Sequence, residues 1–124
     1  MSRPRILVIE DNEMNLELAI TLLETKGFTV ISARTAEEGL RLAQQHLPEL
    51  ILMDFSLPGM DGVTATKSLK ANPATRNLAV IGLSANAMKG VEESALNAGC
   101  SGYLTKPIDT RSFASIIESF LAPK

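Results

Sequence analysis

Three acidic residues stand directly after two uninterrupted apolar runs, and they are the residues of this chain best suited to chemistry. Residues 6–9 (ILVI) run into Glu10 and Asp11, and residues 50–53 (LILM) run into Asp54. Apolar runs of this kind are typical of strands buried on both faces of a parallel sheet. Sites in such sheets form outside the carboxyl ends of the strands. If the two strands are neighbours, three carboxylates meet in one pocket, and their repulsion favours a bound cation. The sequence therefore predicts a divalent-metal site.

Strands and helices alternate five times along the chain and supply the elements that would position these acids. Strands are predicted at residues 6–9, 28–33, 50–53, 78–83 and about 102–104, separated and followed by helices at about residues 13–26, 35–46, 63–72, 87–98 and 113–121. The first helix has helical spacing with a wide buried face that includes Met14, and Gly27 ends it. Thr35 with Glu38 forms a capping box that opens the second helix.

The alternation predicts an α/β fold, a three-layer flavodoxin-like (βα)5 sandwich with right-handed crossovers. Its parallel five-stranded sheet would have the order 2-1-3-4-5, which places the first and third strands side by side at the switch point. Four strands would then end in polar residues at one edge of the sheet, namely Glu10 and Asp11, Asp54, Ser84 and Lys106.

Length and composition narrow the class of protein. With 124 residues the chain is expected to form one domain over residues 1–124, and its 45% hydrophobic and 21% charged residues are ordinary for a soluble globular protein. The net charge of −2 provides no basic stripe, so we expect no binding to nucleic acid. No apolar stretch approaches membrane-spanning length and no signal sequence opens the chain, so we expect no membrane association. The lone Cys100 excludes an internal disulfide and fits a reducing cytoplasm.

Taken in order, the strand-end residues and the turns between them resemble the receiver domains of two-component response regulators, over essentially the whole chain. The resemblance rests on Glu10 and Asp11, Asp54 within residues 52–54, the turn at residues 57–62, Ser84 and Ala85, Ala98 and Gly99, and residues 102–107. The segment at residues 87–90 (AMKG) is similar to small single-domain regulators. The resemblance implies a signalling switch that takes part in its own phosphorylation, and no enzyme in the ordinary sense.

The resemblance also implies a role for each residue of the acidic site. Asp54 would be the phosphoacceptor, whose carboxylate attacks a phosphohistidine of a partner to form an acyl phosphate. Asp11 and Asp54 would bind Mg²⁺, Glu10 would hold a metal-bound water, and the backbone carbonyl of Ser56 would be a further ligand. Lys106 would offset charge on the phosphoryl group. We expect Asp54 to be an exposed strand-end acid, so that Asp54→Asn leaves the fold intact.

Two further residues would form the switch that the resemblance implies. Ser84 would donate its hydroxyl to a phosphoryl oxygen, and Tyr103 would rotate inward behind it, changing the surface of the fourth helix, fifth strand and fifth helix. Simpler interpretations remain open, because Ser84 could cap the following helix and Tyr103 could be a half-buried core aromatic. The resemblance further implies a cis peptide between Lys106 and Pro107. Ser56 and Asn86 would line the path of the water that hydrolyses the acyl phosphate.

The resemblance also implies which proteins would be partners of this chain. His46 is the only histidine and is predicted at an exposed helix end, so a histidine kinase or histidine phosphotransfer protein must supply the phosphohistidine. A downstream protein effector would recognise the phosphorylated form. Two alternatives stay open within the family: a scaffold that binds partners regardless of phosphate, and a receiver excised from a hybrid histidine kinase.

Two alternatives from other classes fit less well. An aspartyl-phosphate phosphatase of the haloacid dehalogenase kind requires a second acid two residues after its nucleophile, and Ser56 stands there. A flavodoxin relative would share the fold, but no hydroxyl-rich phosphate loop follows Ile9.

Overall fold

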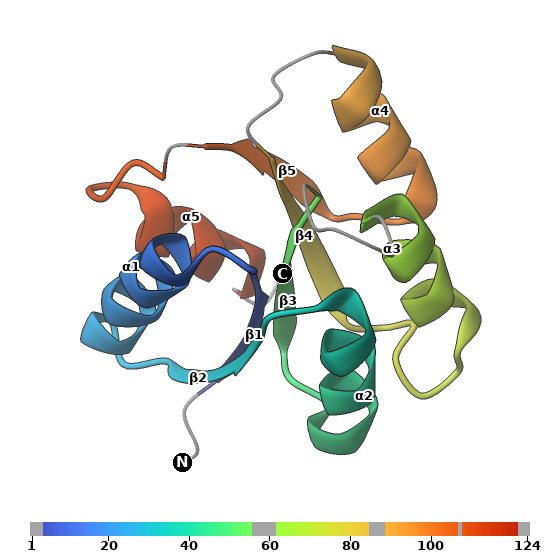
Figure 1. The fold of residues 1–124 in the computed structure, drawn as a ribbon, viewed down its shortest axis with the longest axis horizontal. Helices are drawn as coiled ribbons and strands as arrows, with labels where there is room; N and C mark the ends of the chain where they lie inside the picture. Colours follow the sequence, from blue (N-terminus) through green and yellow to red (C-terminus); the bar gives the residue numbers. More distant parts are fainter. Residues whose placement is uncertain (1–3, 56–61, 85–88, 107, 122–124) are drawn as a thin grey trace.

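The computed structural model describes residues 4–55, 62–84, 89–106 and 108–121. Five strands alternate with five helices in these ranges (Figure 1). In chain order they are β1 (Arg5–Ile9), α1 (Glu13–Thr25), β2 (Thr29–Ala33), α2 (Ala36–His46), β3 (Leu50–Asp54), α3 (Gly62–Ala71), β4 (Ala79–Ser84), α4 (Lys89–Ala98), β5 (Gly102–Thr105) and α5 (Phe113–Leu121). None of the helices within the described ranges combines the length and the apolar character that crossing a membrane requires.

The strands form one parallel sheet in the order β2-β1-β3-β4-β5, which confirms the predicted topology. Helices α1 and α5 lie on one face of the sheet, and α2, α3 and α4 lie on the other (Figure 1). The first and third strands are therefore neighbours, as the acidic site requires, and the predicted three-layer sandwich is the observed one.

The core consists of two apolar layers, one on each face of the sheet. Along β1, Leu7 and Ile9 belong to the layer under α2, α3 and α4, whereas Ile6 and Val8 belong to the layer under α1 and α5. This alternation follows from the two-residue repeat of a strand. Every residue of β3 is buried, as expected for a strand covered on both faces, so the uninterrupted apolar runs were interpreted correctly.

Side-chain caps fix where the first two helices begin. The Asn12 side chain accepts a hydrogen bond from the backbone N–H of Asn15 (3.0 Å), so α1 starts immediately after the first acid pair. The Thr35 hydroxyl accepts from the N–H of Glu38 (3.1 Å), which confirms the first half of the predicted capping box. The second half differs, because the Glu38 carboxylate accepts from the N–H of Arg34 (3.0 Å).

One predicted core residue is exposed instead, and one aromatic residue of α5 is partly exposed. Met14 was expected on the buried face of α1 but is 80% exposed. It lies two residues, about 200° of helical rotation, from the buried Leu16, so it projects from the opposite face. Phe120 in the last turn of α5 is 38% exposed. Its ring covers Gly102 of the edge strand β5, so part of the ring faces solvent.

Candidate metal centre at the carboxyl edge of the sheet

The predicted convergence of the three acids is present in the structure. Strands β1 and β3 pair in parallel with Ile9 opposite Met53, so the residues that follow them lie at the same level. Carboxylate oxygens of Glu10, Asp11 and Asp54 all lie within 4.8 Å of one another. The parallel sheet thus concentrates three negative charges at one point of its edge.

The three acids differ in burial, and one expectation from the sequence was wrong. Glu10 and Asp54 are 2% and 1% exposed, whereas Asp11 is exposed. Asp54 was expected to be exposed because it ends an apolar run. It is buried because β3 is the central strand and continues through Asp54, which pairs with Leu83 of β4.

Lys106 provides a positive charge between the two buried acids. Its Nζ lies 2.8 Å from Glu10 Oε1 and donates a hydrogen bond to Asp54 Oδ2 at 3.1 Å. The backbone positions this side chain, because the N–H of Lys106 donates to the carbonyl of Ser84 (2.8 Å) just beyond the β4–β5 pairing. The lysine therefore reaches from the end of β5, across β4, to the ends of β3 and β1.

The protonation equilibria of the site reflect burial and charge. Burial raises the pKa of Glu10, and its interaction with Asp54 acts in the same direction, against the opposing contacts with Lys106 and the Asn12 N–H. Burial alone would lower the pKa of Lys106, but its contacts with Glu10 and Asp54 prevail and raise it. Among the described residues, three carboxylates thus lie beside one ammonium, and the formal charge of these four groups is negative.

These residues fit a hard divalent cation such as Mg²⁺. The donors are all oxygens, and Glu10 Oε1 is a buried oxygen that finds an ion pair with Lys106 but no well-angled hydrogen bond within the described ranges. The other oxygen, Oε2, accepts from the N–H of Asn12 (3.1 Å), which holds the carboxylate in place. An oxygen-rich site with excess negative charge is what Mg²⁺ prefers.

The other predicted site residues lie next to this cluster or outside the described residues. Ser84 ends β4 and is 4% exposed, one residue past the partner of Asp54. The alternative role of Ser84 as a helix cap concerns the segment at residues 85–88, which lies outside the described ranges. Tyr103 lies on β5 opposite Gly82 and is half-buried. The predictions for Ser56, Asn86 and Pro107 concern residues outside the described ranges.

Sequence reasoning missed two residues. Asn12 caps α1 and holds the Glu10 carboxylate through its N–H. The signal was available, since an asparagine before a helical stretch is a common cap. Phe55 follows Asp54, and its ring packs edge-to-face against Tyr103, with ring centroids 6.0 Å apart and an interplanar angle of 81°. This contact joins the residue that follows β3 to a residue of β5, so no local pattern could have indicated it.

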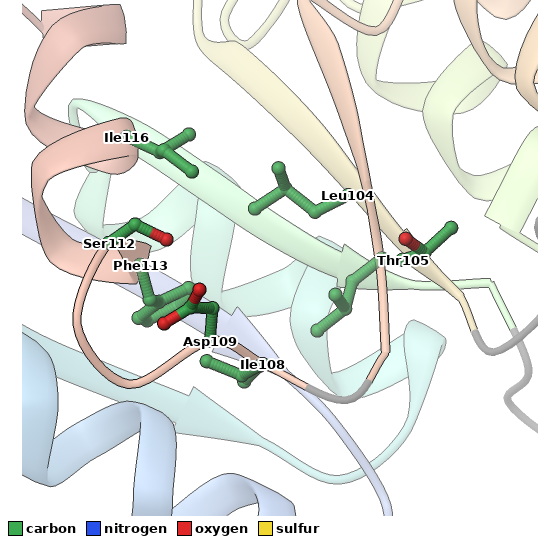
Figure 2. A pocket seen from close by; sticks show the side chains of 8 residues that line it. Leu104, Thr105, Ile108, Asp109, Ser112, Phe113 and Ile116 are labelled. Atoms are coloured by element: carbon green, nitrogen blue, oxygen red, sulfur yellow. The ribbon is translucent and has the colours of Figure 1, made fainter.

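A separate cavity of about 250 Å³ lies between β4, β5 and the start of α5. Figure 2 shows Leu104, Ile108, Phe113 and Ile116 around it, with Asp109 at its side. Asp109 Oδ1 accepts from the N–H of Arg111 (2.9 Å), as a helix-start residue does. The cavity contains none of the clustered acids, so we assign the chemistry to the acidic site.

Comparison with known proteins identifies relatives that match nearly the full length of this chain. The family model described as the response regulator receiver domain matches residues 6–118. The polar-differentiation response regulator DivK of Brucella ovis is 42% identical over 116 residues, which is 94% of this chain and 94% of that protein.

Solved structures agree with that match. A CheY-like receiver domain protein from Methanospirillum hungatei superposes with a TM-score of 0.89 at 29% identity, covering 97% of this chain and 94% of the other. The receiver domain of the sensor histidine kinase PA1611 from Pseudomonas aeruginosa gives a TM-score of 0.88 at 32% identity, covering 97% and 98%. That structure carries a magnesium ion in its active-site cleft.

Proposed function

Because the chain belongs to the response regulator receiver domain family, we propose that it is a phosphorylation-dependent switch whose phosphoacceptor is Asp54. The observation that supports this role is the placement of Asp54, with its carboxylate buried beside Glu10 and Asp11 and hydrogen-bonded to Lys106. A carboxylate held among donors and cation ligands at the edge of the sheet is suited to accept a phosphoryl group.

The proposed reaction is transfer from a phosphohistidine of a partner protein. An oxygen of the ionised Asp54 carboxylate attacks phosphorus, the phosphorus–nitrogen bond breaks, and its electron pair returns to the imidazole of the partner. Asp54 is left as an acyl phosphate. Lys106 already touches Asp54 and can follow the phosphoryl oxygens, offsetting the charge that gathers on them.

Mg²⁺ is the proposed cofactor, held by Asp11 and Asp54 directly, by Glu10 through a bound water and by the backbone carbonyl of Ser56. When bound, it supplies positive charge that neutralises the phosphoryl oxygens and orients them for transfer. The exposed Asp11 leaves this side of the cluster open to solvent. The magnesium ion in the PA1611 receiver domain, which is 32% identical, supports the assignment.

Phosphorylation would act on the surface formed by α4, β5 and α5. The new group brings about −1.5 to −2 charges, and the Ser84 hydroxyl would donate to one of its oxygens. Tyr103 would then favour its inward position, so that phosphate shifts a population that already exists. A downstream protein would recognise and bind the changed surface. We propose a histidine kinase or a histidine phosphotransfer protein as the phosphodonor, and a cytoplasmic location, on the family assignment.

Intact-protein mass spectrometry after incubation with acetyl phosphate tests the proposal. We expect a gain of one phosphoryl group that requires Mg²⁺ and is absent in Asp54→Asn. Phosphate found on another residue would contradict the assignment of Asp54. A folded wild-type protein that gains no phosphate from acetyl phosphate or from a phosphorylated histidine phosphotransfer protein would favour the phosphate-independent scaffold.

A further inference from the structure

The ring of Phe55 occupies a narrow space beside the phosphoacceptor. Two glycines and Tyr103 surround it. A Cβ atom on Gly62, the first residue of α3, would overlap the Phe55 ring. A Cβ atom on Gly82 of β4 would lie 3.1 Å from Phe55 Cε1 and 2.9 Å from Tyr103 Cδ1. The absence of side chains at these two positions is therefore what allows both rings to pack together.

The backbone of Phe55 is fixed to the neighbouring strand. Its N–H donates to the carbonyl of Leu83 at 2.7 Å, and Leu83 lies opposite Asp54 in the sheet and directly before Ser84. Any movement of Asp54 at the end of β3 therefore also moves Phe55, because the two residues are adjacent in the chain. The ring cannot shift far without moving Tyr103, because its edge-to-face partner lies against it.

We propose that Phe55 is the positioning residue that couples the state of Asp54 to the orientation of Tyr103. This inference rests on the proposed function, since it concerns how phosphate at Asp54 reaches the switch aromatic. Asp54 is 1% exposed, so an added phosphoryl group must displace what surrounds it. The described contacts lead from Asp54 through one peptide bond to Phe55, and from the Phe55 ring to Tyr103.

The chain is well suited to a direct test, because Tyr103 is its only tyrosine and it has no tryptophan. Tyrosine fluorescence, or the single fluorine resonance of a fluorotyrosine-labelled protein, therefore reports on Tyr103 alone. Beryllofluoride with Mg²⁺ is the probe, as it mimics a phosphoryl group on a carboxylate. Its binding is followed separately by fluorine NMR of the bound fluoride.

Phe55→Leu is the first variant, with Phe28→Leu, in the layer on the other face of the sheet, as its matched control. We expect Phe55→Leu to bind beryllofluoride while the change in the Tyr103 equilibrium on binding becomes roughly two- to tenfold smaller than in wild type, as the loss of one aromatic pair predicts. Phe28→Leu should keep the wild-type response. If Phe55→Leu and wild type show the same Tyr103 response, the coupling is refuted and the proposed function stands. If wild type binds no beryllofluoride, the proposed function fails and the coupling fails with it.

Gly82→Ala tests the same contact between Phe55 and Tyr103 by a substitution on β4. The added Cβ would crowd Tyr103 and Phe55 together, so we expect an altered Tyr103 signal before any beryllofluoride is added. Gly90→Ala is the control, because a Cβ atom at Gly90 meets nothing within 4 Å. Far-ultraviolet circular dichroism verifies that each variant is folded. A Tyr103 signal in Gly82→Ala that matches wild type would show that Gly82 does not provide room for the two rings and would overturn the inference.

Discussion

Asp54→Asn should make the metal-free protein more stable, although it removes the proposed phosphoacceptor. The substitution keeps the shape of the side chain and deletes one of three negative charges within 4.8 Å of one another. Because Asp54 is 1% exposed, water screens its charge poorly. The wild-type protein therefore folds at the cost of bringing like charges together, and the variant avoids much of that cost.

The distances give the size of the effect. At an effective dielectric constant of about 20, two carboxylates at 4.8 Å, the upper limit of the separations in this cluster, repel by about 3.5 kcal/mol, and Asp54 has two such partners. The ion pair between Asp54 and Lys106 at 3.1 Å offsets this repulsion by an attraction of about 5.4 kcal/mol at the same dielectric constant. Solvent weakens the repulsion between the exposed Asp11 and Asp54, whereas burial of the Asp54 charge adds a desolvation cost to folding of the wild type. We expect a net gain of about 1 to 3 kcal/mol in the free energy of unfolding.

Urea unfolding followed by circular dichroism, with EDTA and then with excess Mg²⁺, measures the effect. Mg²⁺ should stabilise the wild type more than the variant, because it binds the folded state through the charge that the variant lacks. Lowering the pH should also stabilise the wild type more than the variant, because protonation of Glu10 removes repulsion that the variant already lacks. The pKa of Glu10 is raised in the folded protein, so its contribution to stability is full below its ordinary value of 4.5 and is lost as pH rises through the raised value. Lowering the pH into that window should narrow the difference between the two proteins.

Two outcomes would refute this reasoning. A variant that is less stable than the wild type in EDTA would show that the Lys106 ion pair outweighs the repulsion among the acids. A stability difference that Mg²⁺ leaves unchanged would show that its origin is packing or hydrogen bonding at Asp54. Ser32→Ala, an exposed substitution on the edge strand β2, controls for general effects of salt on unfolding.

Three further substitutions test other contacts of the fold by the same urea measurement. Lys106→Met leaves Glu10 and Asp54 without their shared cation and should cost about 2 to 4 kcal/mol in EDTA, less with Mg²⁺; an unchanged midpoint would contradict the ion-pair geometry. Thr35→Ala removes the cap of α2 and should cost about 1 kcal/mol, with Thr35→Ser close to wild type. Gly99→Ala places a side chain at φ +121° and should cost about 1 to 3 kcal/mol, whereas equal stability would show that the backbone relaxes there.

The arrangement of the fold and the convergence of the acids could be predicted from the sequence. Uninterrupted apolar runs identify strands covered on both faces, and the rules for parallel crossovers then leave few sheet orders. Once β1 and β3 are neighbours, acids at their ends must meet. The position of Lys106 after β5 indicated that it belongs to the same edge.

The burial and the contacts of individual side chains could not be predicted in the same way. Whether Asp54 is exposed depends on how far β4 extends beside it, and the end of an apolar run does not reveal that. Met14 fits an apolar helix pattern, yet only the docking angle of α1 decides which side of its first turn meets the sheet. The packing of Phe55 on Tyr103 depends on glycines in two other elements, so it exists only in the assembled sheet.

The charges of the site explain why such a domain can respond to its ligands at all. In the part of the chain that the structure describes, one ammonium pairs with two of the three clustered carboxylates, so repulsion remains after folding. A ligand that brings positive charge relieves this repulsion only in the folded state, and its binding energy therefore appears as stability. A phosphoryl group has the opposite charge and can be accommodated only if cations are already close, which is what Lys106 and a bound Mg²⁺ would provide. The same residual repulsion thus favours binding of the metal first and would make the proposed phosphorylation depend on it, in agreement with the Mg²⁺ requirement that the proposal predicts.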